Sequence, residues 1–336
     1  MNTIETLQIL ITNKCKNPCK FCHFSSNKKG TELQLNIINN IIKQAKELKI
    51  KKIVFNGGEP LEHSNFSNLL KIANKYGYQP FIVTNGQNFK KYLQIFNKYK
   101  PKFWFGLDGM QNKSHDYLRN KKNSFNEVIN AIKKSKENGF FTAINFVVTK
   151  QNYKELPSLF EFASKYKINA IQIIKLVHDG NAYNNNDMDL NQKEEKWVKS
   201  FLLTVKYKFS SPYFNENLAS TCSHLLQKHI SIDWNGKINI CTLSSQFNLK
   251  LPSINKMSLK NAIIKINKIN KHIITQRKKE QYKNQVIDCD FCIENFKKNS
   301  EKYVYNIKCN EKINKLNKTT CNKCKYKLRN QCYFNL

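Results

Sequence analysis

Three cysteines stand close together in the stretch TNKCKNPCKFCHF. Cys15, Cys19 and Cys22 have C-x3-C-x2-C spacing, and they follow the apolar run ETLQILIT, which predicts a β-strand. Three thiolates within eight residues can converge on one metal centre, and four-iron clusters usually have four such ligands. Three ligands without a near fourth leave one iron open to another molecule. A zinc knuckle is the alternative, but structural zinc takes four ligands and the next cysteine is Cys222.

Strand and helix patterns alternate from the amino terminus to about Val177. The strand patterns are ETLQILIT, KKIVFNGGEP, PFIVTNG, PKFWFGLDG, AINFVVT and NAIQIIKLV. Helical patterns connect them, so we expect an α/β fold with a parallel, barrel-like sheet. Six units are too few for a complete eight-fold barrel, and we predict a partial (β/α)6 TIM-like barrel with a wide mouth. The cysteine loop and the segments GGE, TNG and GLDG all follow strands, where the active site of such a barrel belongs.

The pattern changes near Ser210–Pro212, and we predict a core domain over 1–210 and a cysteine-rich domain over 211–336. The segment HISIDWNGKINIC is typical of a hairpin with Asn235 and Gly236 at its turn. A lysine-rich helix is expected over SLKNAIIKINKINKHI. The last fifty residues are dense in cysteine and have too few apolar residues to form a core unaided.

Composition narrows the location and the partners. The net charge of +33 is typical of proteins with an acidic partner such as RNA, but the lysines are spread over every predicted helix, so nucleic acid is not expected as a partner. The chain has no apolar run long enough to cross a membrane and no signal peptide. We therefore expect a cytoplasmic location with reduced thiols. Eleven cysteines, an odd number, also argue against a closed disulfide framework.

The cysteine motif and the segments behind it resemble the radical S-adenosylmethionine (SAM) superfamily. The resemblance implies a four-iron, four-sulfide cluster on the three cysteines, with SAM on the open iron. Phe21 matches the aromatic residue that such enzymes place beside the adenine. Gly57, Gly58 and Glu59 match the segment that binds the SAM amino group, and Asn85 lies in a matching TNG segment.

The segment GLDGMQNKSHDYLRN resembles the branch of this superfamily that has a SPASM domain, which includes anaerobic sulfatase maturases and peptide-modifying enzymes. The matching residues are Leu107, Asp108, Gly109, His115, Asp116 and Arg119. The resemblance implies that Asp108 belongs to the SAM site and that Arg119 pairs with the SAM carboxylate. Leu176 is also expected to contact SAM.

Two residues depart from the pattern of that branch. Gly106 stands where the branch has a serine that contacts SAM, so this hydroxyl contact must be lost or replaced by backbone. Asn120 replaces a common glycine. For His115 and Asp116 we favour structural hydrogen bonds at a helix amino terminus over catalysis.

The remaining cysteines predict further metal sites. Cys222, Gly236 and Cys241 match the opening of a SPASM domain, whereas the later spacing differs from that family. The later cysteines are Cys289, Cys292, Cys309, Cys321, Cys324 and Cys332. Three ligands for the SAM cluster and two sets of four for auxiliary four-iron clusters would use all eleven cysteines. One auxiliary cluster with a structural zinc or an open site is the alternative.

The resemblance implies an oxidoreductase that modifies a ribosomally synthesised precursor peptide through a 5′-deoxyadenosyl radical. If every cysteine is a ligand, no free thiol remains to quench a substrate radical, which favours an oxidative crosslink. Thr242 stands where sulfatase maturases have an aspartate base, which argues against sulfatase maturation. An electron donor such as flavodoxin or ferredoxin is expected, and so is a separate leader-peptide-binding protein, because the chain starts on the first barrel strand.

Two other functions stay open. One is a radical SAM enzyme that acts on a small molecule or nucleotide, like the molybdopterin-precursor cyclase, although the terminal GRR of that family is missing here. The other is a basic RNA-binding protein with structural zinc.

Overall fold

A computed structural model describes residues 4–26, 28–176, 180–205, 209–210, 228–239 and 251–268. The eight cysteines from Cys222 onward lie outside these residues. The auxiliary metal sites and the cysteine-rich domain therefore remain predictions.

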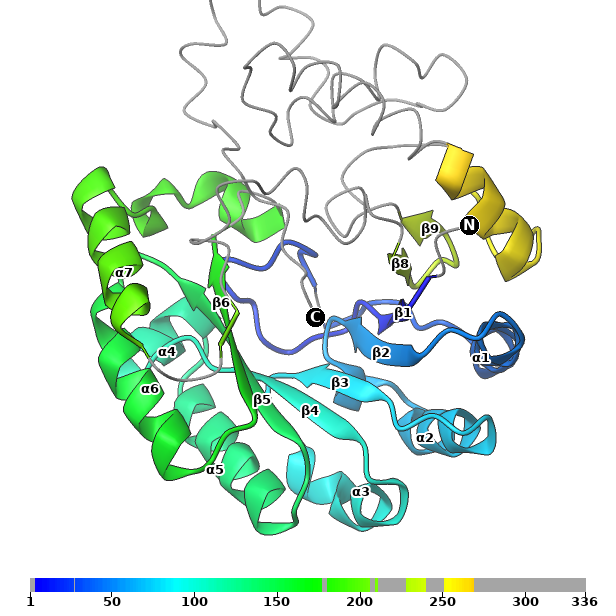
Figure 1. Ribbon diagram of the computed structural model, residues 1–336, viewed down its shortest axis with the longest axis horizontal. Coiled ribbons are helices and arrows are strands. Elements are labelled where there is room, and N and C mark those ends of the chain that lie inside the picture. Colours follow the sequence, from blue (N-terminus) through cyan, green and yellow to red (C-terminus); the bar gives the residue numbers. More distant parts are fainter. Residues whose placement is uncertain are drawn as a thin grey trace, which may run out of the picture.

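The strands form one sheet that curves into part of a barrel (Figure 1). They are β1 (Thr6–Thr12), β2 (Lys52–Gly57), β3 (Phe81–Thr84), β4 (Lys102–Gly106), β5 (Thr142–Val148), β6 (Ala170–Lys175), β7 (Phe209–Ser210), β8 (His229–Ile232) and β9 (Ile238–Asn239). Their order is β7-β6-β5-β4-β3-β2-β1-β8-β9, and the six predicted strands are neighbours in chain order. All pairs from β1 to β7 are parallel, which confirms the partial barrel.

Helices connect the strands and cover the outer face of the sheet (Figure 1). They are α1 (Leu35–Glu47), α2 (Phe66–Lys75), α3 (Leu93–Tyr99), α4 (Asn112–Arg119), α5 (Ser124–Glu137), α6 (Leu156–Lys165) and α7 (Gln192–Thr204). Their buried positions recur at helical spacing, as Ile38, Ile41, Ile42 and Ala45 do in α1. The opposite side of the sheet is left to line the inside of the barrel.

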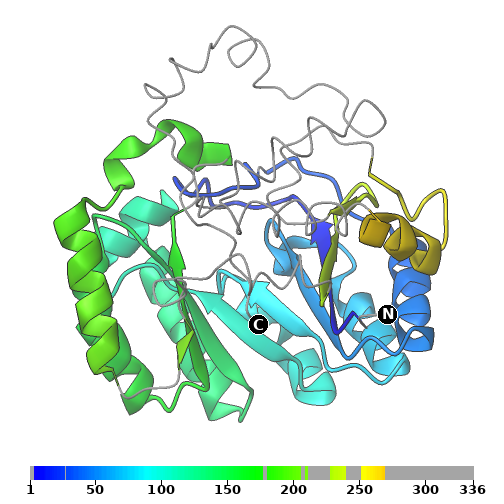
Figure 2. The ribbon, with the colours of Figure 1, turned by 45° about the horizontal axis from the view of Figure 1, so that its top comes forward.

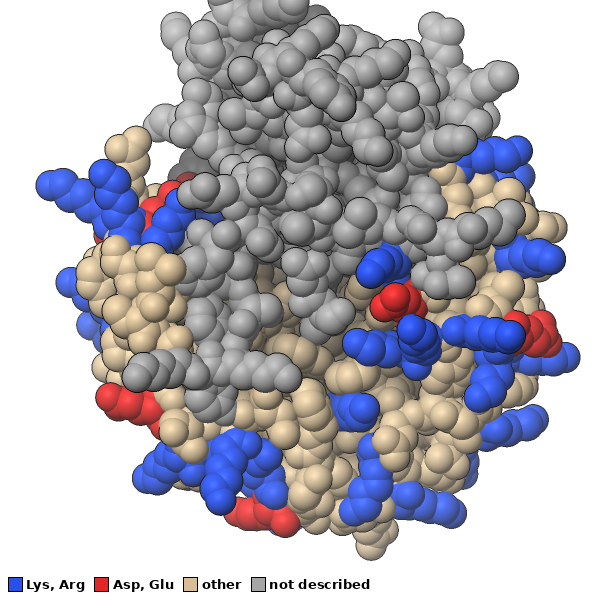
Figure 3. Space-filling model, viewed as in Figure 1, with Lys and Arg blue, Asp and Glu red and all other residues tan. Residues whose placement is uncertain are grey.

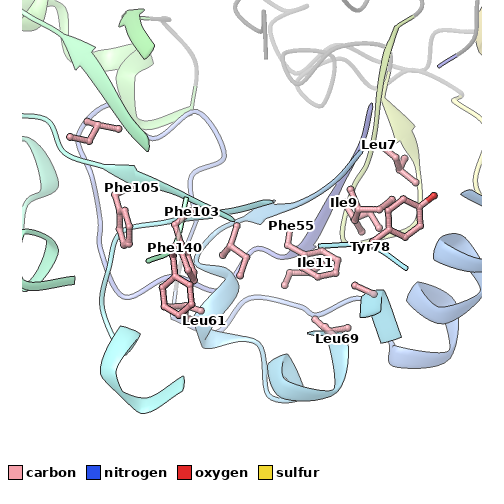
Figure 4. Close-up of a cluster of buried hydrophobic side chains, with 14 of the residues drawn as sticks. Leu7, Ile9, Ile11, Phe55, Leu61, Leu69, Tyr78, Phe103, Phe105 and Phe140 are labelled. Atoms are coloured by element: carbon pink, nitrogen blue, oxygen red, sulfur yellow. The ribbon is translucent and has the colours of Figure 1, made fainter. Parts of the chain in front are cut away.

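Alternation along each strand separates the two faces of the sheet. In β1, Leu7, Ile9 and Ile11 belong to the main hydrophobic core, whereas Gln8 between them lines an internal cavity. Successive side chains of a strand point to opposite faces, so the core residues face the helices and Gln8 faces the inside of the barrel. Figure 4 shows this core between the sheet and its helices, with Leu7, Ile9 and Ile11 at one end.

Aromatic rings fill the other end of this core. Phe103 of β4 is fully buried, and its ring centroid lies 4.8 Å from that of Phe96 and 4.9 Å from that of Phe89. Phe105 and Phe140 lie 5.6 Å and 5.5 Å from it (Figure 4). Most of these pairs are tilted or edge-to-face, the arrangement that aromatic quadrupoles favour.

The predicted hairpin forms, and it extends the barrel sheet. β8 pairs parallel with β1, and β9 pairs antiparallel with β8. Gly236 has φ of 76° at the turn, and the Asp233 carboxylate accepts hydrogen bonds from the backbone of Asn235 and Lys237. The helix over 259–268 packs beside α1, where the Leu259 backbone donates to Gln44 at 2.7 Å (Figure 2). The sheet therefore includes a segment beyond the predicted domain boundary.

Basic side chains are distributed widely over the described surface. On the face in Figure 3 they lie along the left, lower and right rim, from the side of α7 to the side of α1. Among the described residues, no helix is long and apolar enough to cross a membrane.

The aromatic core gives a stability prediction. Replacing Phe103 with Ala should lower the free energy of unfolding by about 4 kcal/mol, because it leaves a cavity between four packed rings. Urea unfolding of the full chain would measure this. Leu203→Ala is the control, since that side chain is 75% exposed and its loss should change stability by less than about 0.5 kcal/mol. Similar losses for both variants would contradict the proposed packing.

Candidate active site

One cavity at the carboxyl ends of the strands collects the predicted site. Every predicted site residue within the described part of the chain lines it: Cys15, Cys19, Phe21, Cys22, Gly57, Gly58, Glu59, Asn85, Gly106, Asp108, Arg119 and Leu176. They come from five different loops or strand ends. The parallel topology explains this, because parallel strands bring their carboxyl ends to one edge of the sheet.

The loop after β1 carries the three cysteines across this end of the barrel (Figure 2). Backbone carbonyls hold it in place: that of Cys19 accepts from the Asn181 amide at 3.0 Å, and that of Lys20 from the Asn185 amide at 3.1 Å. The Leu118 carbonyl at the end of α4 accepts from the backbone of Lys20 at 2.9 Å. Contacts distant in the sequence therefore fix a loop that has no helix or strand of its own.

The glycine pair after β2 lets this loop lie against the next strand end. Gly58 donates to the Thr12 carbonyl at 2.7 Å, and Glu59 donates to the Lys14 carbonyl at 2.7 Å. A Cβ atom at Gly57 would lie 2.1 Å from the Thr12 oxygen, and one at Gly58 would lie 2.1 Å from the Lys14 oxygen. Only glycine permits this approach, so both glycines are needed for packing between two parts of the chain.

Glu59 fastens the end of β3 to the same place. Its buried carboxylate accepts from the backbone of Leu61 at 3.0 Å, the hydroxyl of Thr84 at 2.7 Å and the backbone of Asn85 at 2.7 Å. Burial raises the pKa of Glu59 to about 7, although the three hydrogen bonds oppose the shift. The resemblance implies that this carboxylate binds the amino group of SAM. In the structure it also holds the TNG segment in place.

An ion pair at the end of β4 forms another wall of the cavity. Arg119 donates to Asp108, whose other carboxylate oxygen accepts from the Val147 backbone at 2.8 Å. Although burial lowers it, the Asp108 carboxylate raises the pKa of Arg119 above its ordinary value. The guanidinium therefore stays charged beside Cys19, with Nη1 3.9 Å from the Cys19 sulfur and Nε without a partner among the described residues.

Gly106 makes room for this guanidinium. A Cβ atom at that position would lie 2.1 Å from Nη2 of Arg119. A serine there, as the related branch has, would displace Arg119 from its contact with Asp108. Glycine stands at position 106 in place of serine because Arg119 occupies the space that a serine side chain would need.

His115 and Asp116 have the structural role that the sequence favoured. The Asp116 carboxylate accepts from the backbone of Asn123 and Phe125 and from the hydroxyl of Ser124, at the start of α5. His115 accepts from the backbone of Asp108 at 3.0 Å. Both side chains position the residues around them.

The thiols are a suitable donor set for an iron–sulfur cluster. Burial raises the pKa of Cys15 to about 12 and that of Cys19 to about 11, so each favours its neutral form until positive charge arrives. Metal supplies that charge, and binding then releases the thiol protons. Within the described residues, no three His, Cys, Asp or Glu side chains surround a point where a single ion could sit. In a cluster each thiol can ligate a different iron, and all three cysteines line the same cavity.

Several cavity residues were missed by the sequence analysis. They are Gln8, Asn17, Trp104, Asn145 and Gln172. Asn17 accepts a hydrogen bond from Gln87 at 2.6 Å and so joins the cysteine loop to the loop after β3. Gln8, Asn145 and Gln172 interrupt apolar strand patterns, and this interruption was a visible signal, whereas Trp104 lies in the apolar run KFWFG and gave none.

The pKa of Glu59 predicts how stability depends on pH. A carboxyl whose pKa is raised from 4.5 to about 7 on folding stabilises the fold below pH 4.5, and this contribution is lost as pH rises through 7. The free energy of unfolding of the wild type relative to Glu59→Gln should therefore fall with pH, by on the order of 3 kcal/mol between the two values. Urea unfolding at several pH values would measure it.

Glu32→Gln is the matched control, with the opposite sign. Although burial raises it, hydrogen bonds from Lys14 and Ser64 lower the pKa of Glu32. Its contribution should be present above its ordinary pKa and be lost as pH falls into the acid range. Parallel pH profiles for the two variants would contradict the role assigned to Glu59.

Comparison with known proteins agrees with this geometry. The family model for the radical SAM superfamily matches residues 9–163. Over 225 residues the chain is 23% identical to the Fe-coproporphyrin III synthase of Methanosarcina barkeri, a match that covers 64% of this chain and 54% of that protein. It is 26% identical to the radical SAM cyclopropyl synthase TigE of Paramaledivibacter caminithermalis, over 51% of this chain and 41% of TigE. The chain thus spans about half the length of these relatives.

The chain also shares its fold with a protein of known structure. Streptococcus suis SuiB bound to the precursor peptide SuiA superposes with a TM-score of 0.65 at 19% identity, covering 78% of this chain and 65% of SuiB. Members of the matched superfamily are enzymes. The match of residues 9–163 to the radical SAM superfamily model thus agrees with the cavity that holds the three cysteines.

Proposed function

We propose that this protein is a radical SAM enzyme of the SPASM branch that modifies a ribosomally synthesised peptide. The observation that carries the proposal is the single cavity that joins Cys15, Cys19 and Cys22 to the Asp108–Arg119 ion pair. The fold shared with a protein solved in complex with a precursor peptide supports the substrate class.

The three cysteines would hold a four-iron cluster, and the open iron would take SAM. When bound, this pair of groups supplies the electron transfer and the 5′-deoxyadenosyl radical that removes a hydrogen atom from substrate. Phe21 lies beside Arg119, with its ring centroid 5.3 Å from the guanidinium carbon, and would lie against the adenine. Arg119 would present its remaining N–H groups to the SAM carboxylate, since a guanidinium binds carboxylates through paired hydrogen bonds.

The chain itself provides a dry, fixed site. Leu176 and Ala182 lie in a small buried apolar cluster against which Phe21 packs, so this wall of the cavity excludes water. Glu59 and Asn85 hold the loop after β3 against Cys15, where the Asn85 amide lies 3.9 Å from the sulfur. Exclusion of water and oxygen protects a radical from side reactions.

We further propose that the eight later cysteines hold two auxiliary four-iron clusters in a domain over 211–336. Their number supports this, because two sets of four use them all. A free thiol to return a hydrogen atom would then be lacking, which favours a crosslink over epimerisation, and the clusters would supply an acceptor for the electron that a crosslink releases together with a proton. A reduced flavodoxin or ferredoxin would supply the first electron, and a separate protein would read the leader peptide.

A second candidate is a radical SAM enzyme that acts on a small molecule. The similarity to the Fe-coproporphyrin III synthase favours it, because that match covers a larger share of this chain than the TigE match does. The substrate of the purified enzyme separates the two candidates.

Replacement of Cys15, Cys19 and Cys22 together with Ala tests the central claim. The wild type should hold about twelve irons after anaerobic reconstitution, and the variant about eight. The variant should also lose all reductive SAM cleavage, measured as 5′-deoxyadenosine formed under dithionite. Lys16→Ala, in the same loop and with a side chain that is 60% exposed, is the control and should retain both. Deoxyadenosine from the triple variant would disprove the site, and zinc with only four irons in the wild type would disprove the auxiliary clusters.

Mass spectrometry of a peptide encoded beside the gene tests the reaction. After turnover in deuterated water, the peptide should be lighter by the mass of two hydrogen atoms for each crosslink, because both are removed and none returns from solvent. Unreacted peptide incubated with the triple cysteine variant is the control. Gain of one solvent deuterium would instead show epimerisation, and turnover of a porphyrin or of GTP in place of the peptide would favour the second candidate.

A further inference from the structure

Polar side chains face the inside of the barrel, nearer the amino ends of the strands than the cysteine loop. They are Gln8 of β1, Trp104 of β4, Asn145 of β5 and Gln172 of β6, and all four line the cavity. Parallel strands that are covered on both faces usually carry apolar residues on both. The outward-facing neighbours follow this rule, since Ile144 and Ile171 belong to the core. Inward-facing Val54 and Val83 follow it too, whereas Gln8, Asn145 and Gln172 break it.

Five polar atoms of these side chains are buried and have no hydrogen-bond partner in the described part of the chain. Gln8, Gln172 and Trp104 are 1%, 5% and 6% exposed. Neither amide atom of Gln8 has a partner, and the same holds for Oε1 of Gln172, Oδ1 of Asn145 and the indole nitrogen of Trp104. Buried polar groups normally find partners, and an unpaired one destabilises the fold.

Asn152 is an example of a buried amide side chain with a structural role, because both its amide atoms have hydrogen-bond partners. Its Nδ2 donates to the carbonyls of Asp108 and Val147, and its Oδ1 accepts from the Thr149 backbone at 2.7 Å. The five unpaired atoms of the four inward-facing side chains have no such bond within 4–26 and 28–176. The register brings two of them together, because Asn145 and Gln172 are paired positions on β5 and β6.

The chemistry of these groups indicates their ligand. Carboxamide oxygens accept, while the indole and the Gln8 amide nitrogen donate, and none carries a charge. A peptide group offers one donor and one acceptor and is also neutral. The cations among the described lining residues already have carboxylate partners, Arg119 with Asp108 and Lys175 with Glu195 at 2.6 Å. The lining therefore suits a neutral amide better than a phosphate.

We infer that Gln8, Trp104, Asn145 and Gln172 bind main-chain amides of the substrate peptide and hold the residue to be modified inside the barrel. This assignment rests on the proposed peptide substrate and deepens it. It makes the four residues specificity determinants, separate from the residues expected to hold SAM.

The stability of variants tests the inference without knowledge of the substrate. In the reconstituted enzyme free of peptide, Asn145→Leu and Gln172→Met should raise Tm by a few degrees, because each removes a buried polar group that has no partner to lose. Asn152→Leu is the matched control and should lower Tm, since three hydrogen bonds are lost. If the first two variants lower Tm as the control does, their amides serve the fold and the inference fails.

Binding tests the ligand class. The probe is acetyl-trialanine amide, a short neutral peptide, followed by ligand-observed NMR with the reconstituted enzyme and SAM. The Asn145→Leu/Gln172→Met double variant should bind it at least tenfold more weakly than the wild type. Undiminished binding by the variant, or no binding by the wild type, overturns the inference.

GTP in the same assay helps to distinguish failure of the ligand assignment from failure of the proposed function. Binding of GTP by the wild type that the double variant loses would overturn both the neutral ligand and the peptide substrate. Absence of 5′-deoxyadenosine from the wild type would instead overturn the proposed function, while the Tm comparison still decides whether the four side chains form a binding site.

Discussion

The close contact between the end of β2 and the segment that follows β1 is the constraint on which the site depends. Gly57 and Gly58 lie so near the carbonyls of Thr12 and Lys14 that any side chain would collide with them. This contact fixes the start of the cysteine loop relative to the sheet. Glu59, next in the chain, then carries the same constraint to β3 through Thr84 and Asn85. The carboxyl ends of β1, β2 and β3 are thus held together by contacts within the protein itself.

Burial sets the chemistry of the cavity. Carboxylate, thiol and guanidinium groups lie together where water is excluded, so each depends on its neighbours for its charge state. Arg119 stays cationic because Asp108 faces it, and it lies beside Cys19. The two cysteines inside the protein favour the neutral thiol until a metal replaces the proton. Under the proposed function, the thiols of this site would hold a cluster and the guanidinium would face the SAM carboxylate.

The two faces of the sheet have different roles. Its outer face, with Phe103, Ile9 and Ile144, packs against the helices and provides most of the stability. The inner face carries unpaired amides at Gln8 and Gln172, which destabilise the fold and are explained most simply by a ligand. Natural proteins accept such a cost at functional sites.

The sequence by itself determined the six-strand alternation and the position of the cysteine loop at a strand end. It also determined the structural character of His115 and Asp116. These are local properties, because hydrophobic period, turn residues and motif spacing are written in neighbouring residues.

Tertiary structure alone decided the rest. The hairpin of β8 joins the barrel sheet beside β1, although more than 200 residues separate them in the sequence, since strand pairing is a long-range choice. The glycine at position 106 is likewise explained only by the tertiary structure, because Arg119 occupies the space that a side chain there would need. The partners of Glu59 and the lack of partners at Gln8 also depend on which side chains the curved sheet brings together, and no local pattern encodes that.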